Sequence, residues 1–243
     1  MEISEYKKMD ELEKNHWWFV AKRTFLRLAI DREVGDVSKK KVLDVGCGTG
    51  GVMQMLNELG AECEGVDVSE KALEYCRKKN LKVVQGDGIK LPYADNTFDL
   101  VISSDVLEHI EKDFEAVAEV KRVLKPGGVI IATVPAHQRL FSYHDIALHH
   151  VRRYSKKQFF DLLSGSFSKT NIAWIHSAIL VPAIIQRMVF KIAGKTDSDV
   201  KINSRPINIV LGFWYKVETF IYKLFKGLPF GLSLIGVARK DNL

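Results

Sequence analysis

The chain has 243 residues, 47% of them hydrophobic and 27% charged, and a net charge of +6, which indicates an ordinary globular protein with a basic surface. No stretch reaches the ~20 apolar residues of a membrane span, and the first ten residues lack the apolar core of a signal peptide, so we expect neither. Three cysteines without metal-ligand spacing predict a reduced, cytoplasmic protein.

An N-terminal helical arm is predicted over residues 1–36. Its second helix begins at the aromatic run His16-Trp17-Trp18-Phe19 and reaches about Asp31. These rings either fasten the arm to the core or form a lid over a ligand, in which case Trp18 would contact the substrate.

From Lys41 onward, short apolar strands alternate with helices. Strands are predicted at 42–45, 62–67, 82–85, 98–103 and 129–134, and helices at 52–59, 69–80 and 113–124. This alternation predicts an α/β fold, a doubly wound, Rossmann-like parallel sheet with helices on both faces. Ligands of such sheets bind outside the carboxyl ends of the strands.

The pattern changes after residue 135. A long loop at 135–157 precedes a helix from Ser155 to Leu163, a strand at 167–176, two apolar helices at 178–193 and 207–226, and a last strand at 232–240. The linker 194–204 joins the two apolar helices. We therefore divide the chain into the arm (1–36), an α/β domain (37–177 and 229–243) and a helical insertion before the last strand (178–228).

A glycine-rich loop directly follows the first strand. Glycines stand at 46, 48, 50 and 51, and a helix begins at once. Such a strand–loop–helix unit brings the backbone close to a nucleotide. The spacing of Gly46, Gly48 and Gly51 also fits a dinucleotide fingerprint, so the loop alone does not choose between nucleotides.

Two acidic residues are predicted at the same edge of the sheet as the glycine loop. Asp67 ends the second strand, where a carboxylate can accept hydrogen bonds from ribose hydroxyls, and Asp87 follows the third strand, where it can accept from an adenine amino group. The alternative for each is a loop or capping carboxylate.

Four segments in this order resemble the class I S-adenosylmethionine-dependent methyltransferases. They are VLDVGCGTG (42–50), GVDVS (65–69), GDGIKLPYADNTFDLVISSDVLEHI (86–110) and LKPGGVIIATVP (124–135). The resemblance implies a seven-stranded sheet whose last strand is antiparallel, S-adenosyl-L-methionine as cofactor and S-adenosyl-L-homocysteine as product.

The resemblance also implies roles for individual residues. Asp44 would reach the cofactor's ammonium group, and Asp67 would hold its ribose. The remaining positions, by moiety, are Gly46, Cys47 and Gly48 under the methionine part, Val68, Asp87 and Gly88 at the adenine, and Ser104, Leu107 and His109 along the wall near the sulfonium. Asp44 suits an ammonium and would repel phosphates, which favours the methyl donor over a nicotinamide dinucleotide.

A narrower resemblance concerns the acceptor. ExxHWWF near the N-terminus, HD at 144–145, HxRRY at 150–154 and PFGxSL near the C-terminus are similar to a subgroup of type-11-like methyltransferases associated with cell-surface glycan assembly. This implies a sugar or lipid-linked glycan as acceptor, methylated on oxygen. The alternatives are a small-molecule methyltransferase of quinone or natural-product type, and a cofactor-binding or membrane adaptor module without turnover.

The histidine-rich loop is expected to supply the acceptor site. His144 with Asp145 beside it, or His150, could act as general base for a hydroxyl. Arg152, Arg153 and Tyr154 could hold an acceptor phosphate or carboxylate. The loop's histidines match no recognised metal-ligand spacing, so no metal is expected.

The apolar helices of the insertion are open to two interpretations. They cap the core or a dimer interface, or they attach the protein to the inner face of the cell membrane, where a lipid-linked acceptor would lie. We expect a monomer or homodimer. No nucleic-acid partner is expected, because the sequence has no basic stripe and no base-flipping motif.

Overall fold

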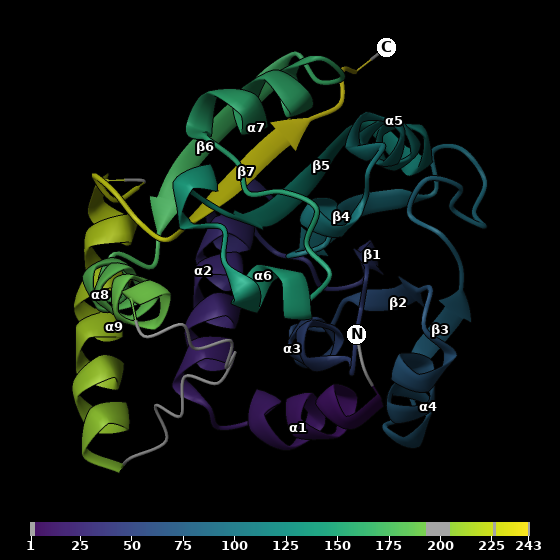
Figure 1. The fold of residues 1–243 in the computed structure, drawn as a ribbon. Helices are drawn as coiled ribbons and strands as arrows, with labels where there is room; N and C mark the ends of the chain where they lie inside the picture. The colour runs from purple at the N-terminus through teal and green to yellow at the C-terminus, as the bar shows by residue number, and fades with distance from the viewer. Residues whose placement is uncertain (1–2, 193–204, 226, 243) are drawn as a thin grey trace.

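A single seven-stranded sheet organises the molecule (Figure 1). The computed structural model describes residues 3–192, 205–225 and 227–242. The strands lie in the order β3-β2-β1-β4-β5-β7-β6, and only β7 runs antiparallel to its neighbours. Their bounds are β1 (Lys41–Val45), β2 (Glu62–Asp67), β3 (Lys82–Gln85), β4 (Phe98–Ser104), β5 (Leu124–Pro135), β6 (Lys169–Ile175) and β7 (Ser233–Arg239). The expected α/β class and the antiparallel last strand are confirmed.

Helices cover both faces of the sheet. The helices are α1 (Ile3–Glu13), α2 (Trp17–Glu33), α3 (Gly51–Glu58), α4 (Glu70–Lys78), α5 (Asp113–Val123), α6 (Tyr143–Ala147), α7 (Lys156–Ser164), α8 (Leu180–Ile192) and α9 (Arg205–Phe225), with 3₁₀ turns η1 (Leu107–His109) and η2 (Gln138–Leu140). One apolar core lies under α2, α3 and α4, and the other lies under α5 and α7.

The N-terminal arm belongs to the core. Phe25, Leu26 and Ile30 of α2 are fully buried, and Tyr222 of α9 packs edge-on against Phe25 with ring centroids 5.2 Å apart. Figure 1 shows α9 and α8 outside α2, so the helical insertion extends the face that α2 begins. None of the described helices is long and apolar enough to cross a membrane.

Two local predictions need correction. We expected a strand to begin at residue 129, after a helix that ends at 124, but β5 already begins at Leu124. The reason is tertiary, because the chain end pairs there: the amide of Lys240 donates to the carbonyl of Gly128 (2.9 Å). The segment 135–157 is also less irregular than expected, since it contains η2 and α6.

Other boundaries agree closely with the sequence. Ser155 caps α7 through a capping box with Gln158, as its position before the apolar pattern predicts. The expected linker 194–204 lies outside the described residues.

Candidate functional site

A cavity of about 850 Å³ opens at the carboxyl ends of β1, β2 and β4. Its lining runs from the glycine loop past Asp67 and Ser104 to the histidine-rich segment around His150. The topology places them together because parallel strands end at the same edge of a sheet. The cavity therefore joins the expected cofactor site to the expected acceptor site.

The glycine loop has no room for side chains. Gly46 has φ +70°, and a Cβ atom on it would lie 2.4 Å from Cγ2 of Val106. Gly48 has φ +54°, and a Cβ atom there would lie 3.0 Å from Cε of Met9. Left-handed backbone and tight neighbours both require glycine, so the loop presents bare backbone to the cavity.

Asp44 is a buried carboxylate without a partner for one of its oxygens. The residue is 2% exposed, and Oδ2 makes no hydrogen bond to any residue that the structure describes. Burial, reinforced by the charge of Glu13, raises the pKa of Asp44 well above its usual range. An unpaired acid at this place costs stability, and a ligand cation would remove that cost. An amino-acid ammonium therefore fits the site.

The second acid ties two loops together. Asp67 accepts hydrogen bonds from the amides of Gly48 and Ser69, each at 2.9 Å. Beside it, Val68 is 65% exposed in the cavity wall. Asp87 accepts from the amide of Ile89 at 3.1 Å. Both acids line the cavity, as does Gly88, so the expected ribose and adenine residues share one wall.

Helix α1 covers the glycine loop, which the sequence analysis missed. Tyr6 and Met9 line the cavity, and Glu13 accepts a hydrogen bond from Oγ1 of Thr49 at 2.7 Å. Asp10 forms an ion pair with Lys79 of the segment after α4, with an N–O distance of 2.6 Å. These residues recur every three or four positions along one helix face, which is the pattern that could have revealed a docked lid.

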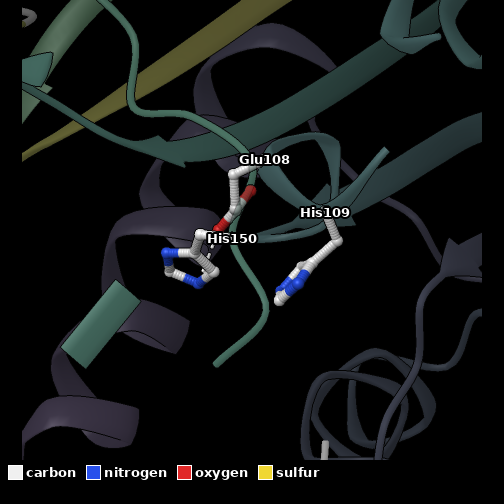
Figure 2. Close-up of side chains that lie close together, drawn as sticks. All are labelled: Glu108, His109 and His150. Atoms are coloured by element: carbon white, nitrogen blue, oxygen red, sulfur yellow. Dashed lines mark ion pairs between the residues drawn. The ribbon is translucent and has the colours of Figure 1, made fainter. Parts of the chain in front are cut away.

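The opposite end of the cavity is polar. His150 Nδ1 lies 3.0 Å from Oδ1 of Asp145, and its Nε2 lies 3.9 Å from Oε1 of Glu108. Figure 2 shows Glu108, His109 and His150 converging, with the rings of the two histidines on either side of the space beside the carboxylate. The ring centroids of His109 and His150 are 4.7 Å apart. Only one of the three, His150, was predicted to have an acceptor-side role.

The electrostatics of this end differ from group to group. Burial raises the pKa of Asp145, but hydrogen bonding from His150 and the charge of Arg153 outweigh it, so the pKa falls below its ordinary value. Burial and the neighbouring charge of Asp105 raise the pKa of Glu108 well above its usual range. Burial and repulsion from His150 lower the pKa of His109 to about 4. Asp145 is therefore ionised and positions the side chains of His150 and Arg153.

The predicted acceptor residues separate into two groups. His144, Arg153 and Trp18 line the cavity. Arg152 and Tyr154 do not, because both side chains bind Oδ2 of Asp113, at 2.6 and 2.7 Å. Their polar groups hold the loop to α5, and neither residue lines the cavity in which we expect an acceptor.

Two predicted cofactor residues are also placed differently. Leu107 is buried in the core, and Val106 takes its place in the cavity wall. The thiol of Cys47 is buried toward Gly65, and Cys47 does not line the cavity.

A further cation lines the cavity from α8. Arg187 is partly buried, and its Nη1 atom has no hydrogen-bond partner among the described residues. Burial and the nearby charge of Arg153 lower its pKa to about 10, so it stays charged at neutral pH. The sequence around Arg187 is an apolar helix and contains no motif that predicts a position in this cavity.

Comparisons with known proteins agree with this geometry. Residues 43–132 match the family model described as a methyltransferase domain. A demethylmenaquinone methyltransferase of Staphylococcus aureus (strain MRSA252) is 33% identical over 132 residues, which are 49% of this chain and 55% of the relative. The chain thus spans about half the length of the curated relatives it matches.

Solved structures share the fold over nearly the whole chain. One such structure is a chain from the complex between the Haloferax volcanii Trm112 methyltransferase activator and a methyltransferase. It has a TM-score of 0.63 and 20% identity, and the match covers 98% of this chain and 94% of that chain. Haemonchus contortus phosphoethanolamine N-methyltransferase 2, in complex with S-adenosyl-L-methionine, has a TM-score of 0.58 and 18% identity, covering 97% of this chain and 60% of its own length. Residues 43–132 are therefore similar to a methyltransferase domain, and nearly the whole chain shares the fold of these solved structures.

Proposed function

We propose that the protein transfers a methyl group from S-adenosyl-L-methionine to a hydroxyl oxygen of a lipid-linked acceptor, with a lipid-linked glycan as the leading candidate. The observation that carries this is one cavity with the bare glycine loop at one end and a histidine–carboxylate group at the other. Asp44, two residues before the loop, is buried and does not itself line the cavity. Such a cavity can bind donor and acceptor side by side, and proximity supplies much of the rate of a transfer reaction.

The residues of the first end would hold the cofactor. Asp44 would pair with its ammonium, and Asp67 would accept hydrogen bonds from its ribose. The other positions that fit are Gly46 and Gly48 along the methionine part, Val68, Asp87 and Gly88 at the adenine, and Ser104 and His109 near the sulfonium. When bound, the cofactor supplies an activated methyl group that needs no further activation by the protein.

His150 is the proposed general base. Because Asp145 is ionised and lies 3.0 Å from Nδ1, that nitrogen carries the proton and donates it in a hydrogen bond, which leaves Nε2 to accept a proton from a hydroxyl. His144 lines the same cavity and is the second candidate. The role of Asp145 is to orient the imidazole of His150.

Arg153 and Arg187 support an anionic acceptor. Arg153 donates from Nε to Asp145 and from Nη1 to the carbonyl of Ala136, so its position is fixed. Arg187 has an unpartnered nitrogen in the same lining. A phosphate or carboxylate on the acceptor would supply the partner that Arg187 lacks.

Exposed apolar side chains on the helical insertion support a lipid-linked acceptor at a membrane surface. On α9, Phe213 and Phe220 are 65% and 63% exposed, and on α8 Val181 and Ile185 are also exposed. Because Arg187 lines the cavity from α8, the same helix joins this apolar surface to the acceptor site. Peripheral attachment to the inner face of the cell membrane follows from this proposal.

A quinone acceptor is the second candidate. The similarity to demethylmenaquinone methyltransferases favours it, although the matched 132 residues are only about half of the chain. A lipid quinone would also suit the apolar helices. The polar groups around His150 and Arg187 favour the hydroxylated, anionic acceptor instead.

Labelled methyl transfer tests the proposal. The chain would be incubated with S-adenosyl-L-methionine carrying a labelled methyl group and with three acceptors: a lipid diphosphate-linked sugar, a demethylated lipid quinol and a soluble sugar phosphate. We expect labelled product and S-adenosyl-L-homocysteine with the first, strongly reduced turnover in His150→Asn, and a raised KM in Arg187→Met. Turnover of the quinol alone would favour the second candidate, and cofactor binding without turnover of any acceptor would favour the adaptor module.

A further inference from the structure

Glu108, His109 and His150 form a cluster that the methyl-transfer proposal uses only in part. One ligand-type atom from each lies within 4.8 Å of the others. Glu108 and His109 belong to η1, just after β4, and His150 follows α6, so segments about 40 residues apart in the sequence meet here. All three residues line the cavity (Figure 2).

The carboxylate of Glu108 is the unusual member. The residue is fully buried, and neither Oε1 nor Oε2 has a hydrogen-bond partner among the described residues. A buried carboxyl group is normally hydrogen-bonded or bound to a cation, because desolvation without a partner costs several kcal/mol. The neighbouring cations are committed elsewhere: Lys22 pairs with Asp105 at 2.8 Å, and Arg153 pairs with Asp145 at 2.6 Å.

The two imidazoles are held so that each keeps one nitrogen available. His150 uses Nδ1 toward Asp145, and His109 has Nδ1 at 3.3 Å from the carbonyl oxygen of His149. A metal-ligating histidine almost always donates its other N–H to a carboxylate or a carbonyl in this way, which fixes the tautomer. Asp145 and the His149 carbonyl are therefore the outer supports that such a site needs.

We propose that Glu108, His109 and His150 bind a divalent transition-metal ion. Two imidazoles and one carboxylate suit Zn²⁺, Mn²⁺, Fe²⁺ or Co²⁺ better than Mg²⁺ or Ca²⁺, which prefer oxygen ligands. Three ligands on one wall leave open coordination positions toward the cavity, as in catalytic metal sites. The site differs from the 144–150 loop set considered in the sequence analysis, because two of its three ligands come from η1.

The catalytic consequence rests on the proposed function. With the ion bound, Nε2 of His150 is a ligand and no longer the general base proposed above, and the ion would lower the pKa of an acceptor hydroxyl in its open position. The hydroxyl proton then passes to water, the oxygen forms its bond to the methyl carbon, and the bond from that carbon to sulfur breaks to leave the thioether. Binding of the ion itself requires no acceptor.

Titration with CoCl₂ tests the site directly. Metal-free chain, without cofactor or acceptor, would be titrated by calorimetry, and the visible absorption of Co²⁺ would report its ligands. We expect one ion per chain and a visible band. Glu108→Gln and His109→Asn should each weaken binding at least ~10-fold, and Asp145→Asn should weaken it by ~10–100-fold, as outer supports do.

The matched control is His149→Asn. His149 lies in the same loop and the same cavity wall, its φ of +60° suits asparagine, and its side chain is outside the cluster. This variant should bind Co²⁺ as the wild type does, and the melting temperature of each variant would show that it is folded. The proposal would be overturned if the wild type did not bind Co²⁺ stoichiometrically. It would also be overturned if Glu108→Gln and His109→Asn bound Co²⁺ with the affinity of the wild type. A chain that binds Co²⁺ but methylates nothing would leave the metal site standing and overturn the proposed function alone.

Discussion

Replacing Asp44 by asparagine should strengthen the fold and weaken cofactor binding at once. Asp44 is 2% exposed, and its Oδ2 atom has no hydrogen-bond partner within the described part of the chain. The charge therefore has a desolvation cost that asparagine, with nearly the same volume, does not have. In the proposed complex, the same charge pairs with the cofactor's ammonium group.

The pH dependence of this effect follows from the raised pKa of Asp44. Burial, with the charge of Glu13, lets the folded state keep this proton at a pH at which the unfolded chain, with an Asp pKa near 3.8, has lost it. The free energy of unfolding contributed by Asp44 is therefore full below pH 3.8 and falls as pH rises through the folded-state pKa. Asp44→Asn removes this loss, so its advantage over the wild type should grow from pH 4 toward pH 8.

The loss of affinity can be estimated from the lost interaction. A hydrogen bond to a charged group contributes about 1.5–3 kcal/mol, so the Kd for S-adenosyl-L-methionine should rise about 10–150-fold. Melting temperatures at pH 5 and pH 8 and calorimetric titration measure the two effects, with the exposed Asp161→Asn as the control that changes neither. Unchanged cofactor affinity, or a lower melting temperature at pH 8, would refute the reasoning.

Three further substitutions probe other parts of the site. Gly46→Ala places a Cβ atom 2.4 Å from Val106 at φ +70°, so it should cost roughly 2–5 kcal/mol and lower the melting temperature by roughly 4–20 °C; no change would contradict the tight loop. Met9→Ala removes the side chain over Gly48 and should raise the cofactor dissociation rate about 2–10-fold in stopped-flow measurements. An unchanged dissociation rate would show that α1 does not act as a lid. Phe213→Ser should reduce sedimentation with anionic vesicles and leave cofactor affinity intact, whereas equal sedimentation would argue against membrane contact through α9.

The sheet and the end of the cavity lined by the glycine loop and Asp67 could be predicted because their information is local. The strand before Gly46 and the acid at Asp67 each follow from a few adjacent residues, and the topology of parallel strands brings the strand ends together. The expected strands at 62–67 and 82–85 agree residue for residue with β2 and β3.

The acceptor end could be predicted only in part, because its contacts join distant segments. The residues next to Glu108 in the sequence do not show that its carboxylate is buried without a hydrogen-bond partner among the described residues. That property depends on segments about 40 residues away in the sequence. Arg152 and Tyr154 were assigned from their polar groups, which Asp113 occupies in the fold. Arg187 is one of two cationic residues in the apolar helix α8, and the packing of that helix brings it to the cavity.

Calorimetric titration of the wild-type chain with S-adenosyl-L-methionine tests the central claim most directly. We predict one binding site per chain and competition by S-adenosyl-L-homocysteine. The Kd should rise in Asp67→Asn, because the carboxylate of Asp67 accepts hydrogen bonds from the amides of Gly48 and Ser69 in the cavity wall. NADH should produce no heat of binding. Absence of both binding heat and thermal stabilisation with S-adenosyl-L-methionine, in a chain shown to be folded, would contradict the account.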